Sequence, residues 1–107
     1  MHLAEIEKSL NDVFITEHLE VINESGMHSV PKGSLTHIKV IVVSEKFKAK
    51  SLLERHQAVY NCLTLYMQQG LHAVSVFAYT PEEWQTRLQK VPPSPPCQGG
   101  RKKEQDN

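Results

Sequence analysis

Two of the six histidines in this chain, His28 and His72, lie where the chain changes direction, and they are the first residues to consider for chemistry. Histidine titrates near neutral pH and is the commonest metal ligand among the side chains. Spacing and composition alone do not establish a site. They do narrow the list of residues that could form one.

The first half of the chain indicates a helix followed by two strands. Apolar residues recur at helical spacing over residues 2–14, which predicts an amphipathic helix. Alternation over 18–23 predicts a short strand, and the segment 24–35, rich in Gly, Pro and Ser, predicts a loop. The β-branched run over 36–44 predicts a strand that is buried on both faces and is therefore central or half-central in a sheet.

The second half begins with a strong helix-start signal. Ser51 and Glu54 have the spacing of a capping box, in which each side chain accepts from the other residue's backbone amide. Gly70 is well placed to end this helix in a left-handed conformation, and a kink or short break inside the helix is allowed for. Alternation over 72–79 predicts a third strand.

A last helix begins at a second cap signal, Thr80 followed by Pro81. Its expected apolar anchors are Trp84 and Leu88, and its expected end lies near Lys90. The following segment is rich in Pro and Gly and then charged, with nothing to bury.

These features divide the chain into one folded domain over residues 1–90 and a disordered tail over 91–107. A chain of 107 residues has room for one modest core and not for two.

The connection between the last two strands has a geometric consequence. Strands at 36–44 and 72–79 are joined by a helix, so they are expected to run parallel as a crossover unit. If they are neighbours, their first residues lie at the same edge of the sheet. The loop 24–35 leads to one of these points and His72 occupies the other. His28 and His72, 44 positions apart in the sequence, would then face each other.

Composition restricts the class of protein. Lys and Arg together number 12, as do Asp and Glu, so the chain lacks the basic excess of a dedicated nucleic-acid binder. Cys62 and Cys97 have neither the spacing of a CxxC motif nor the pattern of a disulfide framework, which favours a reducing, intracellular setting. No apolar run approaches the roughly 18 residues of a membrane span, and no signal-peptide h-region begins the chain.

Three sequence blocks in this order closely resemble the BolA family: VPKGSLTHIKVIVVSEKF, KSLLERHQAVYNCL and LHAVSVFAYTPEEW. The similarity covers roughly residues 3 to 90, and the tail segment SPPCQGG resembles the C-terminus of one subgroup. The resemblance implies an α+β fold: the αββαβα BolA domain, akin to the class II KH fold. It has a three-stranded mixed sheet with helices packed on one face.

The resemblance also implies a partner and a cofactor. Family members bind monothiol glutaredoxins, and many share a 2Fe–2S cluster with them in a heterodimer. The glutaredoxin supplies a cysteine and the thiol of a bound glutathione. The BolA protein supplies a histidine at the start of the third strand and a His or Cys from the loop between the first two strands. In this sequence those positions are His72 and His28, with His37 and His56 as fallback ligands.

Imidazole is a chemically reasonable ligand, since it replaces thiolate on one iron of Rieske clusters. The chain alone is expected to hold no cluster and to be a monomer or weak dimer without a membrane partner. A bacterial cytoplasm and a mitochondrial matrix both fit, the second because the histidine-loop subgroup of the family operates there.

Two departures from the family pattern stand out. The family's Arg-His-Arg motif appears here as Arg55-His56-Gln57, which weakens any role for residue 57 in contacting a phosphate or an acidic partner. The glycine that commonly follows Phe47 is replaced, giving Lys48-Ala49-Lys50, which is expected to alter only the local turn.

Each candidate residue also has a plain structural interpretation. Without the resemblance, His72 before an apolar strand is more often a hydrogen-bonded structural residue, and His28 in a loop is more often simply solvated. His37 is expected to pack or hydrogen-bond beside the central strand. His56 lies on the core stripe of its helix, where a partly buried structural role is the default. Cys62 is expected to be a small core residue.

Three functional classes remain to compare. The favoured hypothesis is a non-enzymatic glutaredoxin partner that co-ligates a 2Fe–2S cluster for cluster assembly, transfer, or iron and redox sensing. The alternative is a KH-like nucleic-acid-binding regulator of transcription or morphology.

Lys48, Lys50 and Arg55 form a candidate basic patch for either partner, although exposed charges are mostly solvated. The zero net charge and the lack of a GxxG loop argue against the alternative. No arrangement typical of an enzyme is present in the sequence.

Overall fold

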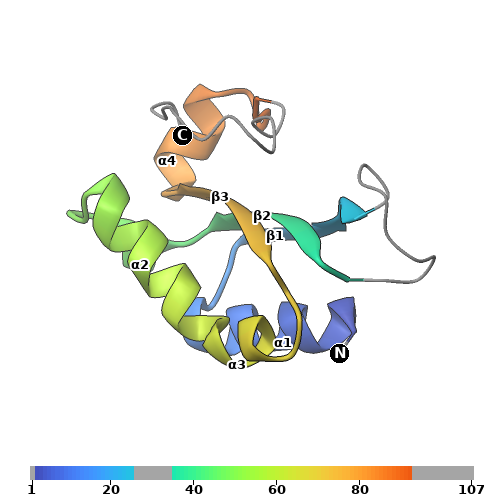
Figure 1. The fold of residues 1–107 in the computed structure, drawn as a ribbon. Coiled ribbons are helices and arrows are strands. Elements are labelled where there is room, and N and C mark those ends of the chain that lie inside the picture. Colours follow the sequence, from blue (N-terminus) through green and yellow to red (C-terminus); the bar gives the residue numbers. More distant parts are fainter. Residues whose placement is uncertain (1, 26–34, 93–107) are drawn as a thin grey trace.

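The computed structural model describes residues 2–25 and 35–92. In chain order the elements are α1 (Leu3–Phe14), β1 (His18–Asn23), β2 (His37–Val43), the 3₁₀ helix η2 (Glu45–Phe47), α2 (Leu52–Cys62), α3 (Thr64–Gln68), β3 (Ala73–Tyr79) and α4 (Pro81–Thr86) (Figure 1). This order confirms the α+β class expected from the sequence. The predicted disorder over 91–107 falls almost wholly outside the described residues and stays a prediction.

The sheet has three strands in the order β1-β2-β3, with β2 in the centre. β1 pairs antiparallel with β2, with His18 opposite Val43. β2 pairs parallel with β3, with His37 opposite Ala73 and Val43 opposite Tyr79. The central, buried strand and the parallel crossover that the sequence predicts are both confirmed.

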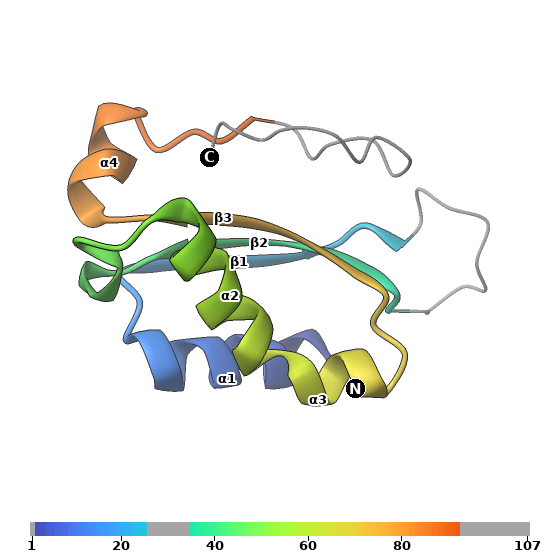
Figure 2. The same cartoon turned by 60° about the vertical axis from the view of Figure 1, so that its left-hand side comes forward.

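The helices divide between the two faces of this sheet. Figure 2 shows α1, α2 and α3 together on one face and α4 on the other. The main core, on the first face, draws on α1, η2, α2, alternate positions of the strands and the connections on either side of α3. Its buried members are Ile6, Leu10, Phe14, Val21, Ile38, Val40, Val42, Phe47, Val59, Leu63, Leu71, Val74, Val76 and Ala78. A second cluster, under α4, consists of Ile41, Val43, Phe77, Tyr79 and Trp84.

The expectation that the helices pack on one face therefore holds for α1, α2 and α3 but not for α4. The reason is that β2 and β3 carry large apolar side chains on both faces, and the second face also needs a cover. Trp84 of α4 supplies it. Its indole stacks on Tyr79 and on His18, with ring centroids 5.6 and 4.9 Å apart respectively.

The two predicted helix caps are both formed. The Ser51 hydroxyl accepts from the Glu54 amide at 3.1 Å, and the Glu54 carboxylate accepts from the Ser51 amide at 2.9 Å. Thr80 and Glu83 make the same reciprocal pair at the start of α4. The break allowed for inside the long helix occurs at Leu63, between α2 and α3.

The end of α4 differs from the prediction. The helix ends at Thr86 rather than near Lys90. Leu88 and Gln89 adopt left-handed φ angles of 56° and 59°. The chain then returns over the sheet, where Val91 packs against the second cluster. Leu88 is therefore 74% exposed, and its expected role as an apolar anchor is wrong. Within Pro81–Thr86, Trp84 is the buried residue that anchors the helix to the sheet.

The outer edge of β3 is covered by side chains from α2. The Tyr60 hydroxyl donates to the Val74 carbonyl at 3.0 Å. Near the other end of the strand, the Arg55 guanidinium donates to the Ala78 carbonyl at 3.1 Å. These are carbonyls that an added strand would otherwise use for pairing.

Among the described residues, no helix has the length and apolar character needed to cross a bilayer.

A strained residue ends α1. Ile15 has φ 51° and ψ 67°, a left-handed conformation that is costly for a β-branched side chain, and it is 65% exposed. Little burial offsets that cost. We expect Ile15→Gly to raise the free energy of unfolding by about 1 kcal/mol. Urea denaturation followed by the fluorescence of Trp84, the single tryptophan, measures this change.

Val13→Gly is the matched control, because Val13 is also exposed but lies inside the helix. Glycine there is expected to lower stability by about 1 kcal/mol or less. Equal losses in both variants would show that the left-handed conformation at residue 15 carries no strain.

Candidate functional site

The candidate site lies where β2 and β3 begin. The Thr36 carbonyl accepts from the backbone amides of both His72 and Ala73, at 2.8 and 3.1 Å. The two strand starts are thus joined through one carbonyl, and the predicted neighbour relationship of these strands is confirmed. The sheet register pairs His37 with Ala73, the residue that follows His72.

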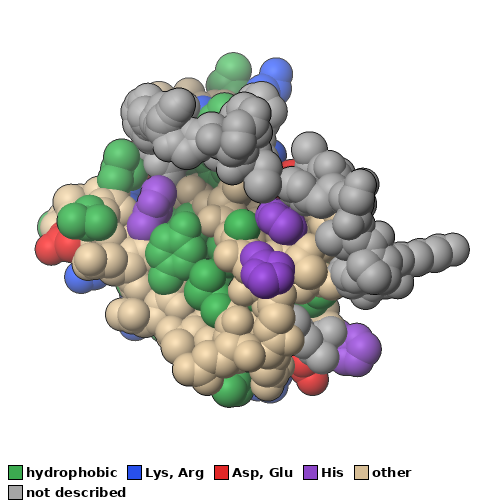
Figure 3. Space-filling view, viewed as in Figure 1, with side chains coloured by type: hydrophobic (Ala, Val, Ile, Leu, Met, Phe, Trp, Pro, Cys, Tyr) green, Lys and Arg blue, Asp and Glu red, His purple; other side chains and the backbone are tan. Residues whose placement is uncertain are grey.

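The side chains of these two histidines are also close. Their ring centroids are 6.4 Å apart, with the ring planes inclined by 46°. His72 is exposed and His37 is half-buried. Figure 3 shows histidine side chains gathered on one face of the molecule, beside a strip of hydrophobic side chains. Two imidazoles at an accessible edge can share a metal-containing ligand.

Ser25 fixes the backbone under this pair, a role that the sequence interpretation did not foresee. It is 2% exposed. Its hydroxyl oxygen accepts from the amides of Thr36 and His37, at 2.8 and 3.1 Å, and donates to the His37 carbonyl at 3.4 Å. A serine within a Gly- and Ser-rich stretch gives no signal that distinguishes it from its solvated neighbours.

Thr36 also contacts the ring of His37. Its Oγ1 lies 2.9 Å from Nδ1 of His37, and the imidazole tautomer decides which atom donates. Hydrogen bonds of this kind fix the orientation of a ligand histidine and select which nitrogen meets a metal. His37 was expected to be a packing or hydrogen-bonding residue beside the central strand, and this contact confirms that part of the interpretation.

The other two candidate ligands are placed differently. His28 lies outside the described residues, so its predicted pairing with His72 stays a prediction. His56 is half-buried in α2, as its position on the core stripe predicts. Within residues 2–25 and 35–92, no group of three or more His, Cys, Asp or Glu side chains is arranged to hold a metal ion.

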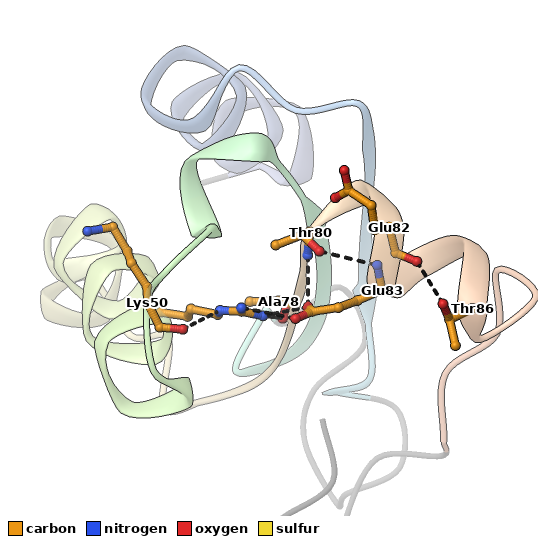
Figure 4. A network of polar contacts seen from close by, with 7 residues as sticks. Lys50, Ala78, Thr80, Glu82, Glu83 and Thr86 are labelled. Carbon is orange, nitrogen blue, oxygen red and sulfur yellow. Dashed lines mark hydrogen bonds and ion pairs between the residues drawn. The ribbon is translucent and has the colours of Figure 1, made fainter.

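Arg55 does not belong to an exposed basic patch, and that prediction is wrong. The residue is 7% exposed. Its guanidinium donates to both carboxylate oxygens of Glu83, at 2.7 and 3.1 Å, and to the carbonyls of Lys50 and Ala78 (Figure 4). A buried cation needs such partners, and this one finds them in three different segments of the chain. The sequence showed a charged residue on a helix but not the face it occupies.

The remaining members of the predicted patch are exposed. Lys48 forms ion pairs with Glu45 at 2.8 Å and with Glu82 at 3.2 Å, and these carboxylates raise its pKa. Lys50 is exposed, and only its carbonyl takes part in the bonds around Arg55. The positive charge available to a partner here is therefore smaller than the sequence suggested.

Cys62, expected to be a small core residue, is partly buried and packs against the main core. Its thiol donates to the Ser9 carbonyl at 3.5 Å. Burial, with a smaller contribution from Asp12, raises the pKa of this thiol and keeps it in the less reactive protonated form. Cys97 lies outside the described residues.

Comparison with known proteins agrees with the resemblance seen in the sequence. The family model described as BolA-like protein matches residues 10–83, well over half of the chain. The chain belongs to the BolA family. A Vibrio cholerae relative named DNA-binding transcriptional regulator BolA is 47% identical over 98 residues, which cover 92% of each chain. Human BolA-like protein 1 is 43% identical over 94% of this chain and 72% of its own length.

Solved structures of BolA proteins share the fold. The solution structure of mouse BolA1 has a TM-score of 0.75 at 40% identity and covers 88% of this chain and 76% of its own. The BolA domain of SufE1 from Arabidopsis thaliana has a TM-score of 0.70 at 35% identity, covering 75% of this chain and 92% of its own. The BolA fold predicted from the sequence is therefore confirmed.

The Arg55–Glu83 pair predicts a pH dependence of stability. Arg55 is the main cause that lowers the pKa of Glu83 from its ordinary value of 4.5. The stabilisation is therefore fully present above pH 4.5 and is lost as the pH falls through the lower, folded-state pKa. We expect Glu83→Gln to be less stable than the unsubstituted protein by about 1–2 kcal/mol at pH 7, and we expect this gap to close under acid.

The measurement is urea denaturation of both proteins between pH 3 and pH 7. The expected loss of stability is smaller than that for a fully buried ion pair, because the Glu83 side chain is 46% exposed. Glu82→Gln is the matched control, with an exposed carboxylate on the same helix and a smaller expected effect. A stability gap for Glu83→Gln that does not change with pH would contradict the assignment.

Proposed function

We propose that this BolA protein is a non-enzymatic partner of a monothiol glutaredoxin and that the two proteins share a 2Fe–2S cluster. The observation that carries the proposal is the proximity of His37 and His72, two imidazoles 6.4 Å apart at an accessible edge of the sheet. The exposed His72 is the ligand that family resemblance implies at the start of the third strand.

The donor set suits one iron of such a cluster. Each iron of a 2Fe–2S cluster takes two ligands from outside the cluster, and imidazoles occupy both positions on one iron of Rieske centres. His72 supplies one nitrogen. The second comes from His28, as the resemblance implies, or from His37, whose ring centroid lies 6.4 Å from that of His72. The thiols of glutaredoxin and glutathione would hold the other iron.

The rigid backbone of the edge supports this role. Ser25 and Thr36 hold the two strand starts with hydrogen bonds of 2.8 to 3.4 Å. Preorganised ligands lose less freedom when they bind, which lowers the cost of holding a cluster at this edge. When bound, the cluster would supply one-electron redox chemistry, and histidine ligation generally raises its potential.

Anaerobic reconstitution tests this proposal. The protein is incubated with iron, sulfide, glutathione and a monothiol glutaredoxin, and the complex is followed by absorption, circular dichroism and EPR. We expect His72→Ala to abolish or convert the spectrum of the shared cluster. His56→Ala should leave it unchanged, because that residue lies within α2 and not at the starts of β2 and β3.

The second ligand is identified by comparing His28→Ala with His37→Ala in the same assay. The variant that alters the spectrum marks the second nitrogen. A complex whose colour and spectrum survive His72→Ala would rule out the shared-cluster proposal at this edge.

DNA binding is the second candidate function, and the names of the bacterial relatives favour it. The Vibrio cholerae relative and an Escherichia coli relative, 39% identical, are both named DNA-binding transcriptional regulator BolA. Lys48 and Lys50 are the exposed cations of the predicted patch that remain for phosphate contact. Against this candidate stands the zero net charge of the chain.

We expect any DNA affinity of this chain to depend on these lysines. Fluorescence anisotropy with duplex DNA over a range of salt concentrations gives the slope of log K against log salt, which reports phosphate contacts at roughly 0.9 each. Lys48→Gln with Lys50→Gln should reduce that slope by about 1 to 2. Lys8→Gln, on α1, is the control. A slope unchanged by the double substitution would place DNA contact elsewhere.

A further inference from the structure

We propose that the cleft between the start of α2 and α4 binds a small phosphate-class anion through Arg55, Lys50 and Arg87. The cleft has a volume of about 470 Å³, and its walls come from the start of α2, the end of β3 and α4. The proposal goes beyond the proposed function, because the site needs no cluster and lies at the opposite end of β3 from His72.

The buried guanidinium of Arg55 has more donors than its protein partners use. A guanidinium carries five N–H groups. Nε donates to the Lys50 carbonyl, Nη1 to the Ala78 carbonyl and to Glu83, and Nη2 to Glu83. Among the described residues, the second N–H of Nη2 has no acceptor in this set of contacts. Arg55 is only 7% exposed, and a buried donor without an acceptor is costly, so a ligand oxygen there is favourable.

The planar geometry of the guanidinium gives the direction of this unused donor. Nη1 and Nη2 both face the Glu83 carboxylate, at 2.7 and 3.1 Å, so the other N–H of Nη2 runs alongside the Nε–H. The Nε–H meets the Lys50 carbonyl at 3.1 Å (Figure 4). The unused donor therefore lies next to the Lys50 backbone, at the wall that this residue gives to the cleft.

Two further cations, Lys50 and Arg87, line the cleft and are called the rim cations below. Lys50 is exposed, and its ammonium forms no ion pair within the part of the chain that the structure describes. The Arg87 guanidinium packs over the Tyr79 ring, 5.1 Å from its centroid, and its Nε donates to the Lys90 carbonyl at 3.0 Å. Its terminal nitrogens form no ion pair with any described carboxylate. Both cations can therefore turn toward an anion in the cleft.

The two carboxylates of the cleft are already matched by other cations. Both oxygens of Glu83 accept from Arg55. Glu82 pairs with Lys48, which lies outside the lining, at 3.2 Å. The charge that remains in the cleft is that of the rim cations, so the balance is positive. Phosphate suits such a site, because its several oxygens accept charge-assisted hydrogen bonds from guanidinium and ammonium groups.

The size of the cleft suits more than a bare ion. Pockets for small molecules are typically about 300–1,000 Å³ in volume. Leu52, which is 39% exposed, adds an apolar wall beside the cations. The phosphate monoester of a small organic molecule would place its phosphate at the cations and its organic part against Leu52. Inorganic phosphate offers the same oxygens without that second contact.

The test is a titration of the full-length protein with sodium phosphate and with glycerol 3-phosphate, followed by ¹⁵N NMR. We expect both anions to shift the Nε–H signal of Arg55. A chloride series at the same ionic strength should leave that signal in place. Tighter binding of glycerol 3-phosphate would identify an organic phosphate as the ligand, whereas equal affinities would identify the free ion.

Substitution of the rim cations keeps Arg55, and with it the fold, intact. We expect Lys50→Gln and Arg87→Gln each to weaken phosphate binding roughly threefold, and the double variant roughly tenfold. Lys46→Gln is the matched control, because this lysine lies on η2 and does not line the cleft. An Arg55 signal that phosphate moves no more than chloride does, or full-strength binding by the double variant, would overturn the proposal. Neither outcome depends on glutaredoxin or on a cluster.

Discussion

A buried guanidinium holds together one end of this protein. Arg55 reaches from the start of α2 to the carbonyls of Lys50 and Ala78 and to the carboxylate of Glu83. The connection into α2, the end of β3 and the start of α4 meet at this one cation. Removing one partner of this buried cation leaves its charge less well compensated and destabilises the fold. The placement of α4, and with it the cover of Trp84 over the second face, depends on this arrangement.

The chemistry lies at the opposite end of the same strands. Strands of seven residues are about 20 Å long, so the Arg55 network and the His37–His72 pair are well separated. At the histidine end, parallel pairing brings together two residues that are distant in sequence, and the Thr36 carbonyl ties their backbones. At one end of the sheet, Arg55 joins α2 and α4 to β3. At the other end, the imidazoles of His37 and His72 lie close together. Substitutions at either end are expected to act independently.

The sequence predicted the elements of this fold well because their signals are local. The capping box at Ser51, the Thr80-Pro81 cap signal and the β-branched run of β2 were enough to place the starts of α2 and α4 and the central strand. Parallel pairing of β2 and β3 followed from the helix between them. The family resemblance, now confirmed, added the fold type.

What the sequence could not supply was the direction in which side chains point after a turn. Arg55 looked like a surface charge until the position of Glu83 was known, and Leu88 looked like an anchor because its left-handed backbone leaves no sequence signal. Ser25 was indistinguishable from neighbouring loop serines, yet its hydroxyl organises the start of β2. In each case the deciding contact joins residues more than ten positions apart or depends on one backbone angle.

The covered edge of β3 bears on how copies of this chain can associate. Continuous edge-to-edge pairing of sheets requires two free edge strands in each molecule, one for each neighbour. Here Tyr60 and Arg55 occupy carbonyls along one of them. Extension of the sheet by a second molecule at this edge would first have to displace these two side chains.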